Sequence, residues 1–318
     1  MRRYITVDGG TTNTRVYLVE DGRVISSVSL GLGSGDSSAR ERLIPRLRDA
    51  VAEMLSARGI AECDVRAIIM SGMISSEYGI RKVPHVPSPA GIKEIREGAH
   101  FEVIEEISPI PCCIIGGVRC FRDTLEGSDV MRGEETELMG IIAGRERSSS
   151  DTSGLYVLPG SHSKLVRIDR RGRITDFSTM LTGEMIAALS QNTILRSSVD
   201  LGAGEPPIDS LIHGYQYATA RGINEALFKA RVLSGFMGRD KEYVYGYFMG
   251  VVLSGEISRI VGEREGRVII GGRAQIRHAM AILLGELTDK EIVELSDDEV
   301  SECVALGAVK IYEYGERG

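Results

Sequence analysis

Alternating apolar and polar residues at the start of the chain predict three strands joined by tight turns. The expected strands are Tyr4–Asp8, Thr14–Glu20 and Arg23–Leu30. Asp21-Gly22, between the last two, is a dipeptide typical of a two-residue hairpin. The chain is therefore expected to open with an antiparallel meander.

A helix and a buried strand are expected next. Leucine, valine and methionine recur at helical spacing from Arg40 to Arg58, and the pattern stops at Gly59. Ala67–Met70 is wholly apolar, which is typical of a strand buried on both faces that delivers a loop to a cleft. We interpret Gly31–Ser38, between the meander and the helix, as a flexible joint.

The second half of the chain repeats the opening pattern. A shift of 150 residues places Gly10-Thr11 on Gly160-Ser161. Strands are expected in this copy at Leu155–Leu158, Lys164–Asp169 and Arg173–Phe177. The repeat predicts two similar domains, 1–150 and 151–318, and we interpret the polar stretch Arg145–Ser153 as the joint between them.

The remaining pattern alternates helices with short strands. Helices are expected at Glu184–Ser190, Thr219–Leu233, Lys241–Ile260, Arg273–Leu284 and Val300–Tyr312, and strands at Arg267–Ile270 and Ile292–Leu295. A meander followed by alternating strands and helices indicates an α/β fold with a mixed sheet.

Composition narrows the class of protein. A length of 318 residues suits two domains, and a net charge of −7 argues against non-specific binding to nucleic acid or to anionic membranes. The chain has no apolar run of about 18 residues and no signal-peptide pattern at its start. Five cysteines without metal-ligand spacing indicate reduced thiols. We therefore expect a cytoplasmic protein.

The turn after the first strand has the chemistry of a phosphate site. It reads Asp8-Gly9-Gly10-Thr11-Thr12-Asn13-Thr14-Arg15. Glycines allow close approach of the backbone, and successive N–H groups with hydroxyls form an anion nest. Asp8 could hold Mg²⁺, which takes one or two carboxylates and keeps several waters. The alternative is an ordinary hairpin turn without a ligand.

The corresponding turn in the second half adds a cation. It reads Gly160-Ser161-His162-Ser163-Lys164. Two such loops could hold the β- and γ-phosphates of a nucleotide from both sides, with His162 as a positioning group or a base. Gly271-Gly272 ends a late strand and could let adenosine lie against the backbone.

Candidate substrate groups lie between the two loops. Glu134 and Glu135 open a predicted helix that runs to about Ala143, where carboxylates are favoured by the helix dipole and one could act as a general base. Gly72–Gly79 and Pro84–Gly91 form a long loop region, which is typical of a binding loop. The alternative for this region is a surface excursion without a ligand.

These segments together resemble the 2-dehydro-3-deoxygalactonokinase family, within the superfamily of sugar kinases, actin and heat-shock chaperone ATPases. The segments that carry the resemblance are Tyr4–Arg15, Ser71–Ser76, Val83–Gly91, Asp129–Thr136, Leu158–Lys164 and Met180–Glu184. Val130–Thr136 is the most specific of them, while the opening motif is shared across the superfamily.

The resemblance implies two ribonuclease H-like domains of the actin-like ATPase fold with a nucleotide cleft between them. It implies Mg²⁺-ATP-dependent phosphorylation of the 6-hydroxyl of 2-dehydro-3-deoxy-D-galactonate. It assigns the base to Glu135, with Arg132 and Glu134 positioning the substrate. The implied substrate site also includes Arg15, Met73, Ser75, Ser76, Pro89 and Ala90.

Three departures from the family pattern concern the acceptor. Gly9 stands where a Trp is usual, which leaves that wall more open or differently filled; Leu165 also replaces a Trp, and Asn192 a His. The alternatives are a kinase for another keto-deoxy acid, such as 2-dehydro-3-deoxygluconate, or an ATP-binding sensor without transfer. The oligomeric state is open, with a homodimer as one expectation.

Overall fold

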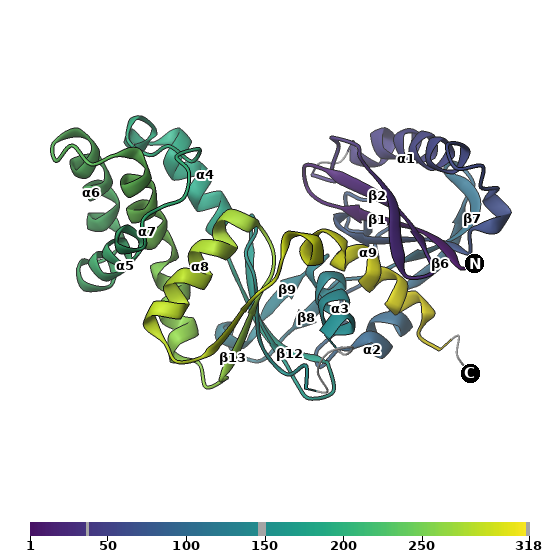
Figure 1. The fold of residues 1–318 in the computed structure, drawn as a ribbon. Coiled ribbons are helices and arrows are strands. Elements are labelled where there is room, and N and C mark those ends of the chain that lie inside the picture. Colours follow the sequence, from purple (N-terminus) through teal and green to yellow (C-terminus); the bar gives the residue numbers. More distant parts are fainter. Residues whose placement is uncertain (36–37, 146–150, 316–318) are drawn as a thin grey trace. The chain divides into compact units, whose positions relative to one another are not determined.

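The computed structural model describes residues 1–35, 38–145 and 151–315 (Figure 1). Residues 36–37 of the predicted flexible joint, and 146–150 of the predicted interdomain joint, lie outside the described residues. The chain groups into two compact units. Unit 1 comprises Met1–Ser153, Arg167–Phe177 and Asp297–Gly318, and unit 2 comprises Gly154–Val166 and Ser178–Ser296. The predicted domains 1–150 and 151–318 stay a prediction.

Unit 1 contains a mixed sheet whose described strands follow the order β3-β2-β1-β4-β7-β6. Their bounds are β1 Arg3–Gly9, β2 Thr14–Glu20, β3 Arg23–Ser29, β4 Ala67–Gly72, β6 His100–Ile104 and β7 Ser108–Ile114. The predicted meander β1-β2-β3 is antiparallel, and the hairpin at Asp21-Gly22 has φ values of 47° and 78°. β4 pairs in parallel with β1 and with β7, which explains its wholly buried apolar sequence.

Alternate residues of β1 face the two helical layers of unit 1. Ile5 and Val7 join the core formed with α1 (Ala39–Ser56), the helix predicted at Arg40–Arg58. Tyr4 meets Tyr312 of α9 (Asp297–Glu313) edge to face, with ring centroids 5.6 Å apart. The sheet therefore has helices on both faces, as Figure 1 shows for this unit.

A small sheet in unit 1 carries the loops that follow β4. Its order is β5-β8-β9, with β5 at Val86–Pro87, β8 at Val118–Cys120 and β9 at Asp129–Met131. The helix α3 (Glu134–Arg145) follows β9, close to its predicted bounds, and α2 (Ile92–Glu97) follows β5. The two-residue strand β5 lies inside the loop region that the sequence indicated.

Unit 2 includes most of the second sheet, in the order β12-β11-β10-β13-β14. The strands are β10 Gly154–Leu158, β11 Ser163–Ile168, β12 Ile174–Met180, β13 Arg267–Ile270 and β14 Glu291–Glu294. β10 and β14 both pair in parallel with β13. Three consecutive neighbouring strands followed by parallel ones repeat the arrangement of the first sheet, so the predicted duplicated meander is confirmed.

The helices of unit 2 are α4 Thr182–Asn192, α5 Ile208–Arg221, α6 Ile223–Gly235, α7 Lys241–Gly262 and α8 Ala274–Leu287. The single helix predicted at Thr219–Leu233 is wrong, because α5 ends and α6 begins on either side of Gly222. That residue has a φ of 86°, which stops a helix. α7 is buried along most of its length within the core of this unit.

Among the described residues, no helix combines the length and the apolar character that a membrane crossing requires.

The contact between α3 and α9 depends on glycines. A Cβ added to Gly140 would lie 1.8 Å from the carbonyl oxygen of Cys303, and one added to Gly307 would lie 2.0 Å from that of Thr136. A Cβ on Gly144, in the same helix as Gly140, would meet no atom of the described residues within 4 Å.

We expect Gly140→Ala to lower the free energy of unfolding by more than about 2 kcal/mol, because α9 must move away from α3. Gly144→Ala is the matched control and should be neutral or stabilising by up to about 1 kcal/mol, since it only improves helix propensity. Urea unfolding of both variants measures the difference. Equal effects would show that the close contact is not a constraint.

Candidate functional site

The first phosphate loop is a tight turn between β1 and β2. The Gly10 N–H donates to the Asn13 carbonyl at 2.8 Å, while Thr11 and Thr12 are exposed. The Asn13 side-chain oxygen accepts from the Ser29 hydroxyl at 2.8 Å and from the Gly31 N–H at 3.0 Å. Asn13 thus fixes the loop, and the two threonines are the hydroxyls that face solvent.

The segment Gly31–Gly35 packs against this loop, although the sequence suggested only a joint. The Ser34 N–H donates to the Gly10 carbonyl at 2.9 Å. A Cβ added to Gly33 would lie 2.3 Å from the Thr11 carbonyl oxygen. The glycines at every second position of this segment were the signal that could have revealed the close approach.

Asp8 is the penultimate residue of β1 and pairs with Arg15 near the start of β2. Burial raises the pKa of Asp8, the nearby positive charge of Arg15 lowers it, and the charge of Glu134 raises it further. The Arg15 guanidinium lies 4.0 Å from the Asp8 carboxylate. Burial thus has the largest effect on the pKa of Asp8, and the charges of Arg15 and Glu134 act on it in opposite directions.

Glu135 is fully buried in the first turn of α3. One carboxylate oxygen accepts from the Gly133 N–H at 2.7 Å and the other accepts from the Thr136 hydroxyl at 3.0 Å. Burial, and then the negative charge of Glu134, raises the pKa of Glu135 to about 7. The carboxyl is therefore held in a fixed place and can exchange a proton near neutral pH.

Glu134 points elsewhere, as expected for neighbours on a helix. Its carboxylate accepts from the Arg132 N–H at 3.1 Å, and the side chain is partly exposed. Glu134 is thus the more exposed of the two carboxylates.

Arg132 joins this helix start to the loop after β4. One terminal nitrogen donates to the Ser75 carbonyl at 2.8 Å and to its hydroxyl at 2.6 Å, and the other donates to the Val83 carbonyl at 3.0 Å. Burial, and then the charge of Arg132, lowers the pKa of His85 to about 4, so its ring is neutral beside the guanidinium. These contacts indicate that Arg132 positions the loop; its predicted contact with substrate stays a prediction.

The remaining predicted substrate residues fall into two groups, one in the loop after β4 and one beside β12. Met73 and Ser76 lie in the same loop as Ser75, which Arg132 holds. Ser75 is fully buried, and Ser76 is 9% exposed. Ala90 is buried and exchanges two backbone hydrogen bonds with Ile174, at 3.0 and 2.8 Å, and Pro89 precedes it. The structure thus brings Ser75 to Arg132 and pairs Ala90 with another strand.

Gly9 lies against the same loop. A Cβ added to Gly9 would lie 2.7 Å from the Cβ of Ile74, so this position has no room for a side chain. Of the two alternatives that the sequence left for this wall, the structure supports a different filling, by Ile74, and not a more open site.

The second phosphate loop lies in unit 2, between β10 and β11. Gly160, Ser161 and His162 are wholly or partly exposed, whereas Ser163 is 0% and Lys164 only 3% exposed. The Gly183 N–H, in the first turn of α4, lies 3.1 Å from each of the Gly160 and Ser161 carbonyl oxygens. A His162 ring nitrogen lies 2.7 Å from the Glu184 carboxylate. The accessible part of the predicted loop is therefore Gly160–His162.

Gly271-Gly272 follows β13 and runs close to the start of this loop. The Gly271 N–H donates to the Val157 carbonyl at 2.9 Å, and a Cβ on Gly272 would lie 2.3 Å from the Pro159 carbonyl oxygen. Gly272 has a φ of 67°, which also requires glycine.

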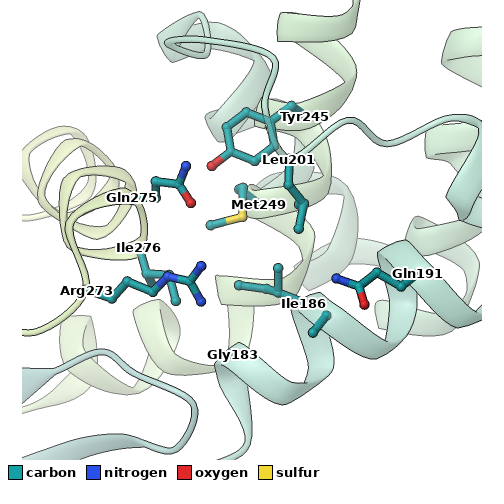
Figure 2. A pocket seen from close by; sticks show the side chains of 10 residues that line it. Gly183, Ile186, Gln191, Leu201, Tyr245, Met249, Arg273, Gln275 and Ile276 are labelled. Carbon is teal, nitrogen blue, oxygen red and sulfur yellow. The ribbon is translucent and has the colours of Figure 1, made fainter. Parts of the chain in front are cut away.

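A pocket of about 120 Å³ lies beyond these glycines within unit 2 (Figure 2). It is lined by Gly183, Ile186, Ala187, Gln191, Leu201, Tyr245, Met249, Arg273, Gln275 and Ile276. Burial raises the pKa of Tyr245 and the charge of Arg273 lowers it. Figure 2 shows the Tyr245 hydroxyl and the Gln275 amide at the same end of the pocket. An apolar floor with a few polar groups suits a flat heterocycle.

Comparisons with known proteins place the chain in a defined group. A family model described as 2-keto-3-deoxy-galactonokinase matches residues 8–306. The 2-dehydro-3-deoxygalactonokinase of Escherichia coli (strain K12) is 28% identical over 263 residues, which cover 80% of each protein. DgoK1 of Rhizobium meliloti (strain 1021), provisionally given the same name, is 32% identical over 62% of this chain and 59% of its own.

Solved structures show the fold. A Sinorhizobium meliloti protein, provisionally named a 2-dehydro-3-deoxygalactonokinase, has a TM-score of 0.75 at 22% identity and covers 98% of this chain and 96% of its own. The Clostridium difficile activator of 2-hydroxyisocaproyl-CoA dehydratase, with bound ADPNP, has a TM-score of 0.51 at 14% identity; the match covers 99% and 95% of the two chains. The predicted actin-like ATPase fold is confirmed.

The raised pKa of Glu135 makes stability depend on pH. Between the usual pKa of 4.5 and about 7, the folded protein retains a proton that the unfolded chain has lost, so the free energy of unfolding falls as pH rises. We expect Glu135→Gln to gain on the order of 2 kcal/mol relative to wild type between pH 5 and pH 8.

Urea unfolding at several pH values measures this difference, with the exposed Glu53→Gln as control. Stability curves of wild type and Glu135→Gln that run parallel from pH 5 to pH 8 would contradict the assignment.

Proposed function

Because the chain belongs to the 2-keto-3-deoxy-galactonokinase family, we propose that it transfers the γ-phosphoryl group of ATP to the 6-hydroxyl of 2-dehydro-3-deoxy-D-galactonate. The observation that carries the proposal is Glu135. A fully buried carboxyl with a pKa of about 7, next to Glu134 in the first turn of α3, suits a general base at neutral pH.

In the proposed reaction, ionised Glu135 accepts the proton of the acceptor hydroxyl as its oxygen attacks the γ-phosphorus. The bond from that phosphorus to the oxygen that bridges it to the β-phosphorus breaks, and ADP leaves with the electron pair. The hydrogen bonds from Gly133 and Thr136 hold the base in place. The proton remains on Glu135 until solvent removes it.

Asp8 and Glu134 are the residues that we propose for Mg²⁺. Their carboxylates are the type of ligand that Mg²⁺ takes, and the charge of Glu134 acts on Asp8 by raising its pKa. When bound, Mg²⁺ would supply counter-charge for the phosphate oxygens.

Each unit is proposed to have its own phosphate-binding groups. Gly10, Thr11 and Thr12 offer N–H groups and hydroxyls in unit 1, and Gly160–His162 offer the same in unit 2. The pocket beside Gly271-Gly272, with Tyr245, Arg273 and Gln275, is proposed to take the adenosine. A cytoplasmic location and a homodimer stay predictions.

The substrate proposal is tested by coupled ATP consumption with a panel of keto-deoxy acids and simple sugars. We expect 2-dehydro-3-deoxy-D-galactonate to give the highest kcat/KM, and the gluconate epimer a lower one. A higher kcat/KM for the epimer would move the assignment to the other acid that the departures at Gly9 and Asn192 left open. ATP binding without turnover for any acceptor would overturn the kinase assignment.

The base is tested by Glu135→Gln, which we expect to lower kcat by about 10²–10⁴-fold while the Kd for ATP stays within about threefold. Below pH 7 the wild-type kcat should fall about tenfold per pH unit, because protonated Glu135 cannot accept a proton. The residual activity of the variant should lack this dependence. Glu53→Gln is the control, since Glu53 is exposed on α1.

A further inference from the structure

Three polar side chains are buried behind the second phosphate loop, on three different elements. Ser163 on β11, Thr182 on α4 and Glu256 on α7 are 0%, 2% and 7% exposed. The Thr182 hydroxyl donates to one oxygen of the Glu256 carboxyl. Among the described residues, the other carboxyl oxygen and the Ser163 hydroxyl have no hydrogen-bond partner. Ser163 shares its strand face with Leu165, which belongs to the same core as Ile257 of α7.

A buried carboxyl with one unsatisfied oxygen is costly to a fold. Burial raises the pKa of Glu256 to about 7, and the hydrogen bond from Thr182 lowers it. An apolar residue at this position of α7 would avoid the free-energy cost of burying a carboxyl. We therefore expect Glu256 to have a role other than packing.

The contact with Thr182 leads directly to the phosphate loop. Gly183, the next residue, approaches the Gly160 and Ser161 carbonyl oxygens through its N–H. A Cβ added to Gly183 would lie 2.4 Å from the Gly160 carbonyl oxygen, so no side chain separates the helix from the loop. A shift of Thr182 must therefore move the loop.

The same two helices also form the neighbouring pocket. Gly183 and Ile186 of α4 line it from one side, and Tyr245 and Met249 of α7 line it from another (Figure 2). Glu256 is seven residues beyond Met249, two helical turns along α7 and on the same side of the helix. The contact between Glu256 and Thr182 thus ties α7, which lines the pocket, to α4, which lines the pocket and contacts the loop.

We propose that Glu256 is a positioning residue for the nucleotide: through Thr182 it fixes the start of α4, and thereby the Gly160–Ser161 loop and the pocket wall, in the arrangement that binds ATP. The inference rests on the proposed function for the identity of the ligand. It assigns Glu256 no contact with the nucleotide and no part in the transfer step.

The test removes either end of the contact. We expect Glu256→Ala and Thr182→Val each to raise the Kd for ATP about tenfold, the effect of losing one hydrogen bond to a charged group. The KM of the acceptor and kcat should stay within about twofold. Glu256→Gln should keep the Kd within about threefold, because its amide oxygen still accepts from Thr182. The double variant should bind no more weakly than either single variant.

Val251→Ala is the matched control, since Val251 is fully buried on the opposite side of the same helix. It should lower Tm without changing the Kd for ATP. An equal rise in Kd in this control, or additive effects in the double variant, would overturn the inference. If Glu256→Ala fails to fold, Thr182→Val, which keeps the side-chain shape, decides by itself.

Titration with a fluorescent ATP analogue measures the Kd without turnover, so the two proposals fail separately. If the Kd for the nucleotide depends on Glu256 but no acid is phosphorylated, this inference stands and the proposed kinase activity is rejected. If an acid is phosphorylated but Glu256→Ala and Thr182→Val leave the Kd for ATP unchanged, the kinase activity stands and this inference is rejected.

Discussion

The contact between α3 and α9 is the constraint on which the chemistry of unit 1 depends. Gly307 allows α9 to touch the Thr136 carbonyl, one residue from Glu135. The start of α3 is thereby held from behind by a helix that comes more than 150 residues later in the chain. From the other side, Arg132 ties the same helix start to Ser75 and Val83. As the proposed base, Glu135 would therefore need little reorganisation before the reaction.

The same arrangement has a cost in stability. A carboxyl whose pKa is raised to about 7 by burial is less favourable in the folded state than in water once it ionises. The two hydrogen bonds from Gly133 and Thr136 recover part of that free energy. Glu256 in unit 2 presents the same compromise, with a single hydrogen bond from Thr182. Sites of this kind are typical of function placed on a fold at the expense of its stability.

Local patterns predicted β1–β4, β10–β14, the turns of the two meanders and most of the helices, but none of β5–β9. The Asp21-Gly22 hairpin and the two meanders follow from alternation and turn residues alone. Gly222 was read as part of one helix because apolar spacing continues across it, and only its positive φ separates α5 from α6. Elements that depend on distant partners, such as the two-residue strand β5, have no pattern of their own.

The sequence predicted the candidate site residues that lie within one continuous segment. It did not predict the contacts between residues that come from different segments. Glu135 in a first helical turn is visible in the sequence, but its complete burial is not. The approach of Gly33 to Thr11 and the placing of Ile74 against Gly9 arise only from folding. Tyr245 and Arg273 come to one pocket from α7 and the residue before α8, with no motif to join them.

The return of α9 to unit 1 also sets an order for biosynthesis. Residues 1–153 leave the ribosome well before Asp297, so the face of the first sheet that includes Tyr4 has no helix α9 to cover it during that interval. At roughly 5–20 residues per second the delay is on the order of ten seconds. The last residue of unit 2 is Ser296, so all segments of unit 2 are synthesised before the last segment of unit 1. The N-terminal half of this protein is therefore the last to be completed in translation.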